Sequence, residues 1–449
     1  MLRRSAYRQL MDWKRLKTQQ GLLIMGARQV GKTTLVREFA ANEYQRLAEV
    51  NFIESPQAAD TVSKASDAKD LLLRLSILAG TEIVPGETLL FLDEIQACQD
   101  VLTWVKFLVE MRDLDIVLSG SMLGVDLFNV RSLPVGFLQT MVMKPLDFFE
   151  FCDACGLPSS ALFTMQECFF SHCEVPDYLH EKLTDLWYKY LLVGGMPDAV
   201  QAFVDSSDLN RVRNVQKAIV DLYELDITKY VPDLVERRHI KTIYESIVNQ
   251  LNAPNKRFKF TKLGNGSRFV HMRTAFDWLA NAGIALPTLK VQEPRYPMGD
   301  HASENSFKLY LNDVGLLTSQ LMREVDLEIL NRRSSMNYGS IFENAAAQEL
   351  FAKGYELFYY NQGNIGEVDF LLQDARGGVS LCEIKSGKDY TRHRAMNNLL
   401  DTQNYEFSHA WVFHDGNVER KGVVEYLPIY MLACLDPSMT ASASDVTAL

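Results

Sequence analysis

The sequence predicts an α/β protein of several domains, in which the first domain is built on a parallel sheet. Two observations support this fold class. In the first third of the chain, short apolar runs alternate with amphipathic stretches, and a second alternation of this kind begins near residue 338. Strands covered by helices on both faces are apolar throughout, and parallel strands are usually connected by helices. A chain of 449 residues, 47% of them hydrophobic, is long enough for two to four domains.

The strands of the first domain are predicted at short, mainly apolar runs. These runs are 21–25 (GLLIM), 48–53, 88–92, 114–118 and 138–143. The stretches between them have helical periodicity, as at 35–41 and 101–111. We therefore predict a parallel sheet with crossover helices and place the end of this domain at residue 155.

The remainder of the chain changes its pattern along its length. Residues 156–237 are rich in helical patterns, with a Gly-Gly break at 194–195 that predicts a turn between two helices. Residues 238–330 have the rhythm of a winged helix, because two helical patterns flank a loop and a strand-like segment follows. Residues 331–432 return to alternating helices and strands. The small, polar residues of 433–449 predict a disordered tail.

The charge and hydropathy of the chain exclude several classes of protein. A net charge of −11 gives no overall basic field, so any contact with nucleic acid or an anionic membrane must be local. We find no run of about 18 apolar residues that would predict a membrane-spanning helix. The basic start of the chain is not followed by the apolar stretch of a secretory signal. These features predict a cytoplasmic protein without membrane contact.

The cysteines raise the question of a zinc site. There are seven, an odd number without a secretory signal, which favours reduced thiols over disulfides. Cys152, Cys155, Cys168 and Cys173 form two close pairs that could enclose zinc. Because the sequence around them lacks Gly-rich turns, we favour buried thiols and keep zinc as the alternative.

A phosphate-binding turn is predicted at residues 26–33 (GARQVGKT), between the first apolar run and a helix. In such a turn, successive backbone N–H groups and a helix N-terminus bind phosphate. Gly26 and Gly31 let the backbone approach, Lys32 reaches the β- and γ-phosphates, and the Thr33 hydroxyl binds magnesium. The predicted ATP contacts are Gly26, Ala27, Arg28, Gln29, Val30, Gly31, Lys32, Thr33 and Thr34.

The second half of a nucleotide site follows about 60 residues later. The segment TLLFLDEI places Asp93 and Glu94 at the end of a buried strand, where Asp93 can hold magnesium and Glu94 can polarise the attacking water. The next strand ends in IVLSGS. Ser119 and Ser121 are therefore predicted to contact the γ-phosphate or the water, with simple turn residues as the alternative.

A second group of carboxylates lies in the C-terminal region. Asp369 lies in GEVDF, and Glu383 and Lys385 lie two apart in CEIK, on one face of a strand. Glu343, on the preceding helix, completes the set. This order resembles the PD-(D/E)XK nuclease superfamily, which implies magnesium or manganese held by Glu343, Asp369 and Glu383, with Lys385 activating water. The alternative is a nuclease-like domain kept for packing or partner binding.

Four segments of the first domain, GARQVGKTT, LLFLDEIQ, IVLSGS and PLDFFEF, carry a wider resemblance. The chain resembles AAA-type ATPases of bacteria and archaea that have an associated C-terminal domain of unknown function. YLLVGGMPDAV, DLYELDITKYV and LYLNDVGLL extend the resemblance over nearly the whole chain. It implies a P-loop ATPase fold with an additional strand, a helical lid, a winged-helix module, a small α/β nuclease-like domain and action as a homo-oligomer.

The chain departs from this family at one position. Related chains commonly carry a basic residue, a candidate arginine finger, where this chain has Phe137 in SLPVGFLQT. Arg131 is close enough in sequence to substitute, or it is a solvated loop charge. The departure makes rapid hydrolysis a weaker expectation than nucleotide binding.

Two basic groups are candidates for contact with DNA or RNA. The first is the stretch Lys256–Lys262 with Arg268 and Arg273, in the region with winged-helix rhythm. The second consists of Lys388, Arg392, His393 and Arg394. The sequence leaves two functions open: an ATPase coupled to a module that binds or cleaves nucleic acid, and a nucleotide-dependent switch that recruits a protein partner.

Overall fold

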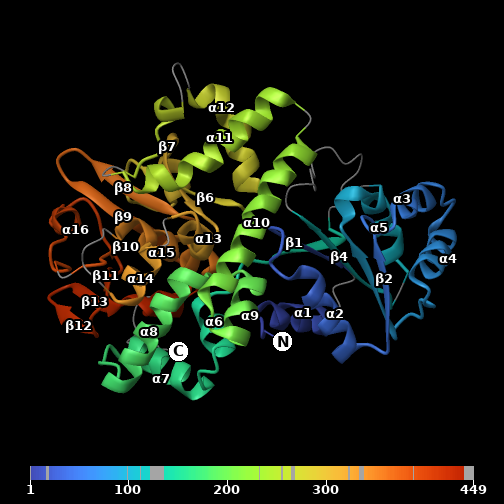
Figure 1. The fold of residues 1–449 in the computed structure, drawn as a ribbon, viewed down its shortest axis with the longest axis horizontal. Helices are drawn as coiled ribbons and strands as arrows, with labels where there is room; N and C mark the ends of the chain where they lie inside the picture. The colour runs from blue at the N-terminus through green and yellow to red at the C-terminus, as the bar shows by residue number, and fades with distance from the viewer. Residues whose placement is uncertain are drawn as a thin grey trace. The chain divides into compact units, whose positions relative to one another are not determined.

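The computed structural model describes residues 2–16, 20–98, 100–111, 113–121, 136–231, 233–253, 256–263, 268–321, 324–332, 338–387 and 389–438. The chain divides into two compact units, Met1–Lys144 with Asn281–Gly283 and Pro145–Ala280 with Ile284–Leu449. Both units combine helices with strands (Figure 1).

The first unit is built on a five-stranded sheet in the order β2-β3-β4-β1-β5. Its elements are α1 (Ala6–Leu16), β1 (Gly21–Gly26), α2 (Lys32–Glu43), β2 (Arg46–Asn51), α3 (Pro56–Ser63), α4 (Ala68–Ala79), β3 (Thr88–Asp93), η1 (Ile95–Ala97), α5 (Val101–Val109), β4 (Asp115–Ser121) and β5 (Leu138–Val142). Every pairing in this sheet is parallel, which confirms the predicted α/β class with a parallel sheet. β4 lies between β1 and β3, so it is the additional strand that the family resemblance implied.

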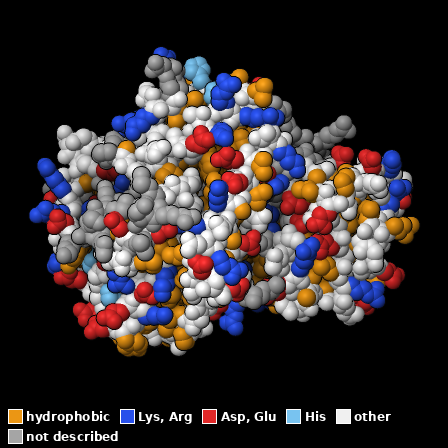
Figure 2. Space-filling view, viewed as in Figure 1, with side chains coloured by type: hydrophobic (Ala, Val, Ile, Leu, Met, Phe, Trp, Pro, Cys, Tyr) orange, Lys and Arg blue, Asp and Glu red, His pale blue; other side chains and the backbone are white. Residues whose placement is uncertain are grey.

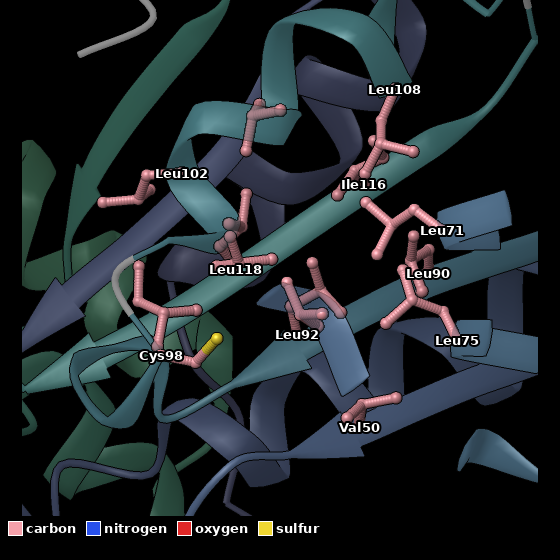
Figure 3. Packing of buried hydrophobic residues seen from close by; sticks show 14 of the residues in the cluster. Val50, Leu71, Leu75, Leu90, Leu92, Cys98, Leu102, Leu108, Ile116 and Leu118 are labelled. Atoms are coloured by element: carbon pink, nitrogen blue, oxygen red, sulfur yellow. The ribbon is translucent and has the colours of Figure 1, made fainter. Parts of the chain in front are cut away.

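The apolar runs form strands because both faces of the sheet are covered. All six residues of β3 are buried. Side chains from β3 and β4 meet the apolar faces of α4 and α5 in one core (Figure 3). The side chains shown include Val50, Leu71, Leu75, Leu90, Leu92, Cys98, Leu102, Leu108, Ile116 and Leu118. Each fully buried leucine contributes about 1.5–3 kcal/mol, so this core fixes the positions of the strand ends.

The second unit begins with helices. They are α6 (Phe148–Ala154), α7 (Ser159–Ser171), α8 (Asp177–Val193), α9 (Pro197–Ser206), α10 (Leu209–Tyr230) and α11 (Leu234–Leu251). The predicted Gly-Gly turn separates α8 from α9. A Cβ on Gly195 would lie 2.0 Å from the Leu146 carbonyl oxygen, which explains why the turn requires glycine there.

The rest of this unit contains an eight-stranded mixed sheet, in the order β12-β13-β11-β10-β9-β8-β6-β7. Its elements are η2 (Phe260–Leu263), α12 (Phe269–Asn281), β6 (Ala285–Val291), η3 (Met298–His301), β7 (Ala302–Leu311), α13 (Val314–Ser319), α14 (Glu324–Leu330), α15 (Gly339–Lys353), β8 (Phe358–Gln362), β9 (Gly366–Gln373), β10 (Val379–Ile384), α16 (Arg394–Leu400), β11 (Ala410–His414), β12 (Glu419–Lys421), β13 (Val424–Pro428) and η4 (Ile429–Cys434).

The two regions divided at residue 330 in the sequence share this sheet. β6 and β7, from the region with winged-helix rhythm, pair with each other, and β6 also pairs in parallel with β8. Helix α15 contacts strands from both regions, β7 and β10. At the other end, Ala433, Cys434 and Leu435 are buried, so the packed chain continues past residue 432. Residues 439–449 of the predicted tail lie outside the described residues.

A buried polar network joins the segments that carried the family resemblance. The Gly195 N–H donates to the Asp313 carboxylate at 2.6 Å, and the Val314 N–H donates to Gln348 at 2.7 Å. The Phe148 N–H and the Tyr190 hydroxyl both contact Oε1 of Glu349, at 2.9 and 2.8 Å. PLDFFEF, GGMP and LYLNDVGLL therefore meet around α15, which is buried on nearly all sides.

The surface matches the acidic but mixed composition. On the face seen in Figure 2, Lys and Arg side chains are interspersed with Asp and Glu side chains. Among the described residues, no helix is both long and apolar enough to cross a membrane.

Candidate nucleotide site and a C-terminal carboxylate cluster

The predicted phosphate-binding turn follows β1 and leads directly into α2, whose first residue is Lys32. Gln29 has a φ of 64° and Gly31 a φ of 92°, left-handed conformations that glycine adopts without strain. A Cβ on Gly26 would lie 2.3 Å from the Met143 carbonyl oxygen. The turn therefore needs glycine both for its own shape and for its packing against the end of β5.

Lys32 is turned back onto the turn that carries it. Its Nζ donates to the carbonyl oxygens of Gly26 and Ala27, at 3.1 and 3.0 Å. Burial lowers the pKa of this amine to about 8, although the carboxylates of Glu94 and Asp93 oppose that shift. An anion at the turn would offer the ammonium a stronger partner than two neutral carbonyls.

The Asp93 carboxylate accepts hydrogen bonds from four residues of the site. Its Oδ2 accepts from the Thr33 hydroxyl at 2.9 Å and from the Asn51 amide at 3.1 Å. Its Oδ1 accepts from the Glu94 N–H at 3.0 Å and from the Ser119 hydroxyl. The buried carboxylate thus receives donors from the phosphate-binding turn and from the ends of β2 and β4.

The oxygen atoms here are of the kind that magnesium binds. The Thr33 hydroxyl, in the N-terminal turn of α2, and the Asp93 carboxylate are hydrogen-bonded to each other at 2.9 Å and would both face a magnesium ion bound with the phosphates. When bound there, magnesium would neutralise phosphate charge and be held by oxygen ligands of the kind it prefers.

Glu94 occupies an unusual backbone position. Its φ of 57° is left-handed, and the Gln96 amide bonds Oε2 of its side chain. A non-glycine residue in this conformation is held there by its surroundings. Glu94 thus follows Asp93 directly at the end of β3, with its carboxylate bonded to the Gln96 amide.

Lys32, Thr33, Asp93, Glu94 and Ser119 lie together at the carboxyl ends of the parallel strands. Two further residues, which the sequence did not indicate, also contribute to the site. Asn51 is one, since its register opposite Asp93 appears only once β2 and β3 are paired. Arg4 is another: its guanidinium donates to the carbonyls of Val30 at 2.9 Å and Lys144 at 2.6 Å. The backbone of Ser121 ends β4, but its side chain is not among the described atoms.

Phe137 lies beside the start of β1, at the opposite end of this strand from the phosphate-binding turn. Its carbonyl accepts from the Gly21 N–H, at the start of β1. The six residues of β1 span about 20 Å, so a side chain at position 137 cannot reach the phosphate-binding turn of its own chain. Arg131, the other candidate, lies outside the described residues.

The C-terminal carboxylates predicted from the sequence do come together. Glu343 is on α15, Asp369 on β9, and Glu383 on β10. The Lys385 Nζ is 2.7 Å from Oε1 of Glu383, and the Ile384 N–H donates to Asp369 at 2.9 Å. All three carboxyl groups are buried.

An ammonium group that the sequence analysis did not single out lies among them. Lys308 on β7 is fully buried, and its Nζ is 2.7 Å from Glu367, 3.4 Å from Glu343 and 3.8 Å from Asp369. Tyr310, two residues along the same strand, donates its hydroxyl to Glu343 at 2.9 Å. Lys256 also pairs with Glu343. We call these residues, with Glu383 and Lys385, the carboxylate cluster.

The surroundings raise the pKa values of Lys308 and Asp369 above their ordinary values and lower that of Glu343. Burial disfavours the charged form of Lys308, but Glu343 and the other carboxylates outweigh it and raise its pKa. Burial likewise opposes ionisation of Glu343, yet Lys308 and Lys256 lower its pKa. For Asp369, burial and then the charges of Glu343 and Glu383 raise the pKa. Lys308 and Glu343 thus each favour the charged form of the other.

The structure gives no support to the divalent metal that the sequence predicted at the cluster. Among the described residues, no three His, Cys, Asp or Glu side chains form a group that could hold a metal ion. The Lys308 ammonium lies 3.4 Å from Glu343 and 3.8 Å from Asp369, two of the three acids predicted to bind the metal. The four cysteines considered for zinc are also not grouped this way: Cys152 and Cys168 are buried, Cys155 is partly buried and Cys173 is exposed.

The residues of the two predicted basic groups do not share one surface, because some of them are buried or paired with acids. Lys256 points into the carboxylate cluster, and Arg273 pairs with Glu304 at 3.3 Å. His393 is buried and bonded to the Tyr426 hydroxyl at 2.7 Å, and burial lowers its pKa, so it adds no positive charge to the surface. Arg392 and Arg394 are exposed, whereas Lys388 lies outside the described residues.

Comparison with known proteins places three family matches along the chain. Residues 18–152 match an AAA domain, residues 184–326 a domain of unknown function (DUF8612), and residues 338–432 a second domain of unknown function (DUF4143). No curated protein matches the sequence.

Solved structures show remote likeness. The Walker-type ATPase PABY2304 of Pyrococcus abyssi is 15% identical, with 71% of this chain and 95% of that chain covered and a TM-score of 0.42. The Aeropyrum pernix Orc1 protein, solved in complex with DNA, is 13% identical, with 74% and 93% covered and a TM-score of 0.29. Pyrobaculum aerophilum Cdc6p is 11% identical, with 73% and 93% covered and a TM-score of 0.25. The segment that matches an AAA domain, residues 18–152, contains the phosphate-binding turn and Asp93.

Proposed function

We propose that this chain binds ATP with magnesium at residues 26–34 and hydrolyses it, with Glu94 polarising the attacking water. The observation that supports this most strongly is the position of Asp93. Its carboxylate is bonded to the hydroxyls of Thr33 and Ser119 and to the Asn51 amide, at the carboxyl ends of parallel strands. In this proposal the Lys32 ammonium leaves the carbonyls of its own turn to hold the β- and γ-phosphates.

We further propose that the state of the nucleotide governs partner binding by the second unit. The chain passes between units at Lys144–Pro145. On the side of the first unit, Arg4 bonds both the Lys144 carbonyl and the Val30 carbonyl of the phosphate-binding turn. A rearrangement of that turn would therefore act close to the connection. Because Phe137 replaces the usual basic residue, a basic group that completes the site would come from Arg131, from elsewhere in a neighbouring copy or from a partner.

The nucleotide half of the proposal is tested by Lys32→Ala. Removing the ammonium should abolish ATP binding, because the turn loses its only side-chain cation predicted to reach the β- and γ-phosphates. Isothermal titration with ATP and magnesium measures this, with Lys64→Ala, an exposed lysine after α3, as the control. Unchanged ATP affinity in Lys32→Ala would remove the proposed site.

The second candidate function is a metal-dependent nuclease, favoured by the convergence of Glu343, Asp369, Glu383 and Lys385. The ammonium of Lys308 among these acids favours the switch instead. Incubation of the wild type with several DNA and RNA forms, with magnesium or manganese and with ATP or a non-hydrolysable analogue, separates the two. Cleavage that Asp369→Ala removes would establish the nuclease. Absence of cleavage, with ATP turnover unaffected by nucleic acid, is the result expected of a switch that recruits a protein.

A further inference from the structure

Lys308 occupies the carboxylate cluster in a way that a flexible surface lysine could not. Its side chain has no exposed area, and β7, which carries it, pairs with β6 through residue Thr288 at this position. A fully buried ammonium is stable only when carboxylates surround it. Three do so here, with Glu367 nearest at 2.7 Å.

Most of the oxygen atoms that a metal would need already have partners, although Oε2 of Glu383 is buried without a hydrogen-bond partner among the described residues. Oε2 of Glu343 receives the Tyr310 hydroxyl and the Lys308 ammonium, and its Oε1 receives Lys256. Oδ2 of Asp369 accepts from the Ile384 N–H, and Oε1 of Glu383 accepts from Lys385. A divalent ion would have to displace several of these donors.

The charges within the cluster also nearly balance. Its four carboxylates, Glu343, Glu367, Asp369 and Glu383, face the three ammonium groups of Lys256, Lys308 and Lys385. At most one negative charge is left for a further cation. Adding a divalent ion without expelling a lysine would leave net positive charge in a buried site, which is strongly unfavourable.

We propose that Lys308 is the resident cation of the carboxylate cluster and excludes divalent metal from it. The ammonium joins β7 to α15 and β9, as a structural metal would join its ligands. In this proposal, β7, α15 and β9 are held together by an ammonium group in place of a metal. The nuclease-like domain then lacks the metal centre that a nuclease would need. This inference concerns a site separate from the nucleotide site, so it stands or falls independently of ATP hydrolysis.

Solvent reaches the outer members of the cluster, since the side chains of Glu367 and Lys385 are 28% and 24% exposed. Lys256 lines a cavity of about 210 Å³ together with Asn252, Ser340 and Ile341. Its side chain is 17% exposed, whereas that of Lys308 is not exposed at all. Loss of Lys256 should therefore admit water beside Glu343, while the inner ammonium stays in place.

The test is Mn²⁺ binding to the full chain without nucleotide, measured by electron paramagnetic resonance. Asp93→Asn serves as the reference background, so that the nucleotide site contributes no Mn²⁺. In that background we expect no Mn²⁺ that a further Asp369→Asn removes. Lys308→Met should create one Mn²⁺ site, and Asp369→Asn should abolish it again. Lys290→Met, on the neighbouring strand β6, controls for the change of residue type and should create none.

Two results would overturn the proposal. One is a Mn²⁺ ion bound with Lys308 intact and lost on Asp369→Asn. The other is a folded Lys308→Met protein, with native circular dichroism, that neither gains Mn²⁺ nor has its melting temperature raised by it. If Lys308→Met fails to fold without metal, Mn²⁺ should restore folding, and failure to do so would also count against a cation-replacing role.

Discussion

Lys32 is a buried amine whose charge depends on pH close to the physiological range. Burial lowers its pKa to about 8, against the pull of Glu94 and Asp93. Bound phosphates would favour the ammonium and raise that pKa again. ATP binding is therefore expected to take up a proton at pH values above about 8, but not below.

This linkage gives a prediction about affinity. From pH 6.5 to 8, the affinity contributed by Lys32 should be constant, because the amine is charged before and after binding. Above about 8 the affinity should fall, by up to tenfold per pH unit, since a proton must be bound as well. Calorimetric titrations in two buffers of different ionisation enthalpy measure both the affinity and the proton. Constant affinity up to pH 9.5 would mean that Lys32 is charged in the free protein throughout.

Asn51 illustrates a site residue that the sequence alone does not reveal. Its amide bonds Asp93, and its Oδ1 accepts from the N–H groups of Ile53 and Glu54. It therefore orients the carboxylate from a strand that carries no recognised motif. In the sequence Asn51 lies inside the apolar run 48–53, where a single polar residue gives no signal of a site.

Substituting Asn51 tests this orienting role. Asn51→Ala should weaken magnesium binding in the presence of ATP by about 10–100-fold, because residues that orient a metal ligand have effects of this size. Asn42→Ala, an exposed asparagine at the end of α2, is the matched control and should change nothing. Equal magnesium dependence of ATP binding in both variants would show that Asp93 needs no support from β2.

At the scale of elements, the segments after the ATPase domain are explained by a polar core around α15. Burial, with Asp147 nearby, raises the pKa of Glu349 to about 8, and burial raises that of Asp313 to about 6. Glu349 is therefore protonated when folded at neutral pH and ionised when unfolded. Below the unfolded pKa both states hold the proton, and between that value and about 8 only the folded state does.

The stability of the second unit should reflect this difference. As pH rises from 6 to 8, Glu349 should lower the free energy of unfolding by up to about 1.4 kcal/mol per pH unit. Glu349→Gln, which keeps an oxygen acceptor for Phe148 and Tyr190, should decline less steeply than the wild type. Urea unfolding at a series of pH values measures the slopes. Glu181→Gln, on the exposed side of α8, should follow the wild type, and identical slopes for all three would show that Glu349 is ionised when folded.

The sequence pattern predicts strand positions better than it predicts which faces of a strand are buried. Apolar runs located the strands of the first sheet to within about three residues, because burial on both faces leaves a continuous signal. On β7, however, Ser306, Lys308 and Tyr310 alternate with Phe307, Leu309 and Leu311. Such alternation normally indicates that one face of the strand is exposed to solvent. Here both faces are buried, and the polar face meets the carboxylates of α15 and β9.

At the scale of the whole molecule, motifs tied to backbone shape were predictable and long-range pairing was not. The phosphate-binding turn and Asp93 could be placed because each depends on a few adjacent residues. The pairing of β6 with β8, which are far apart in the sequence, leaves no local mark. The inclusion of β6 and β7 in the second sheet, and with it the arrival of Lys308 among the acids, therefore needed the structure.

ATP hydrolysis at the proposed site depends on Glu94 polarising the attacking water. The most direct measurement is phosphate release from ATP with magnesium, combined with the nucleotide retained by the protein. The wild type should release phosphate. Glu94→Gln should retain unhydrolysed ATP, because it keeps the side-chain amide oxygen but cannot polarise water as a carboxylate does. Glu87→Gln, just before the other end of β3, should behave as the wild type. Phosphate release by Glu94→Gln at the wild-type rate would contradict the account.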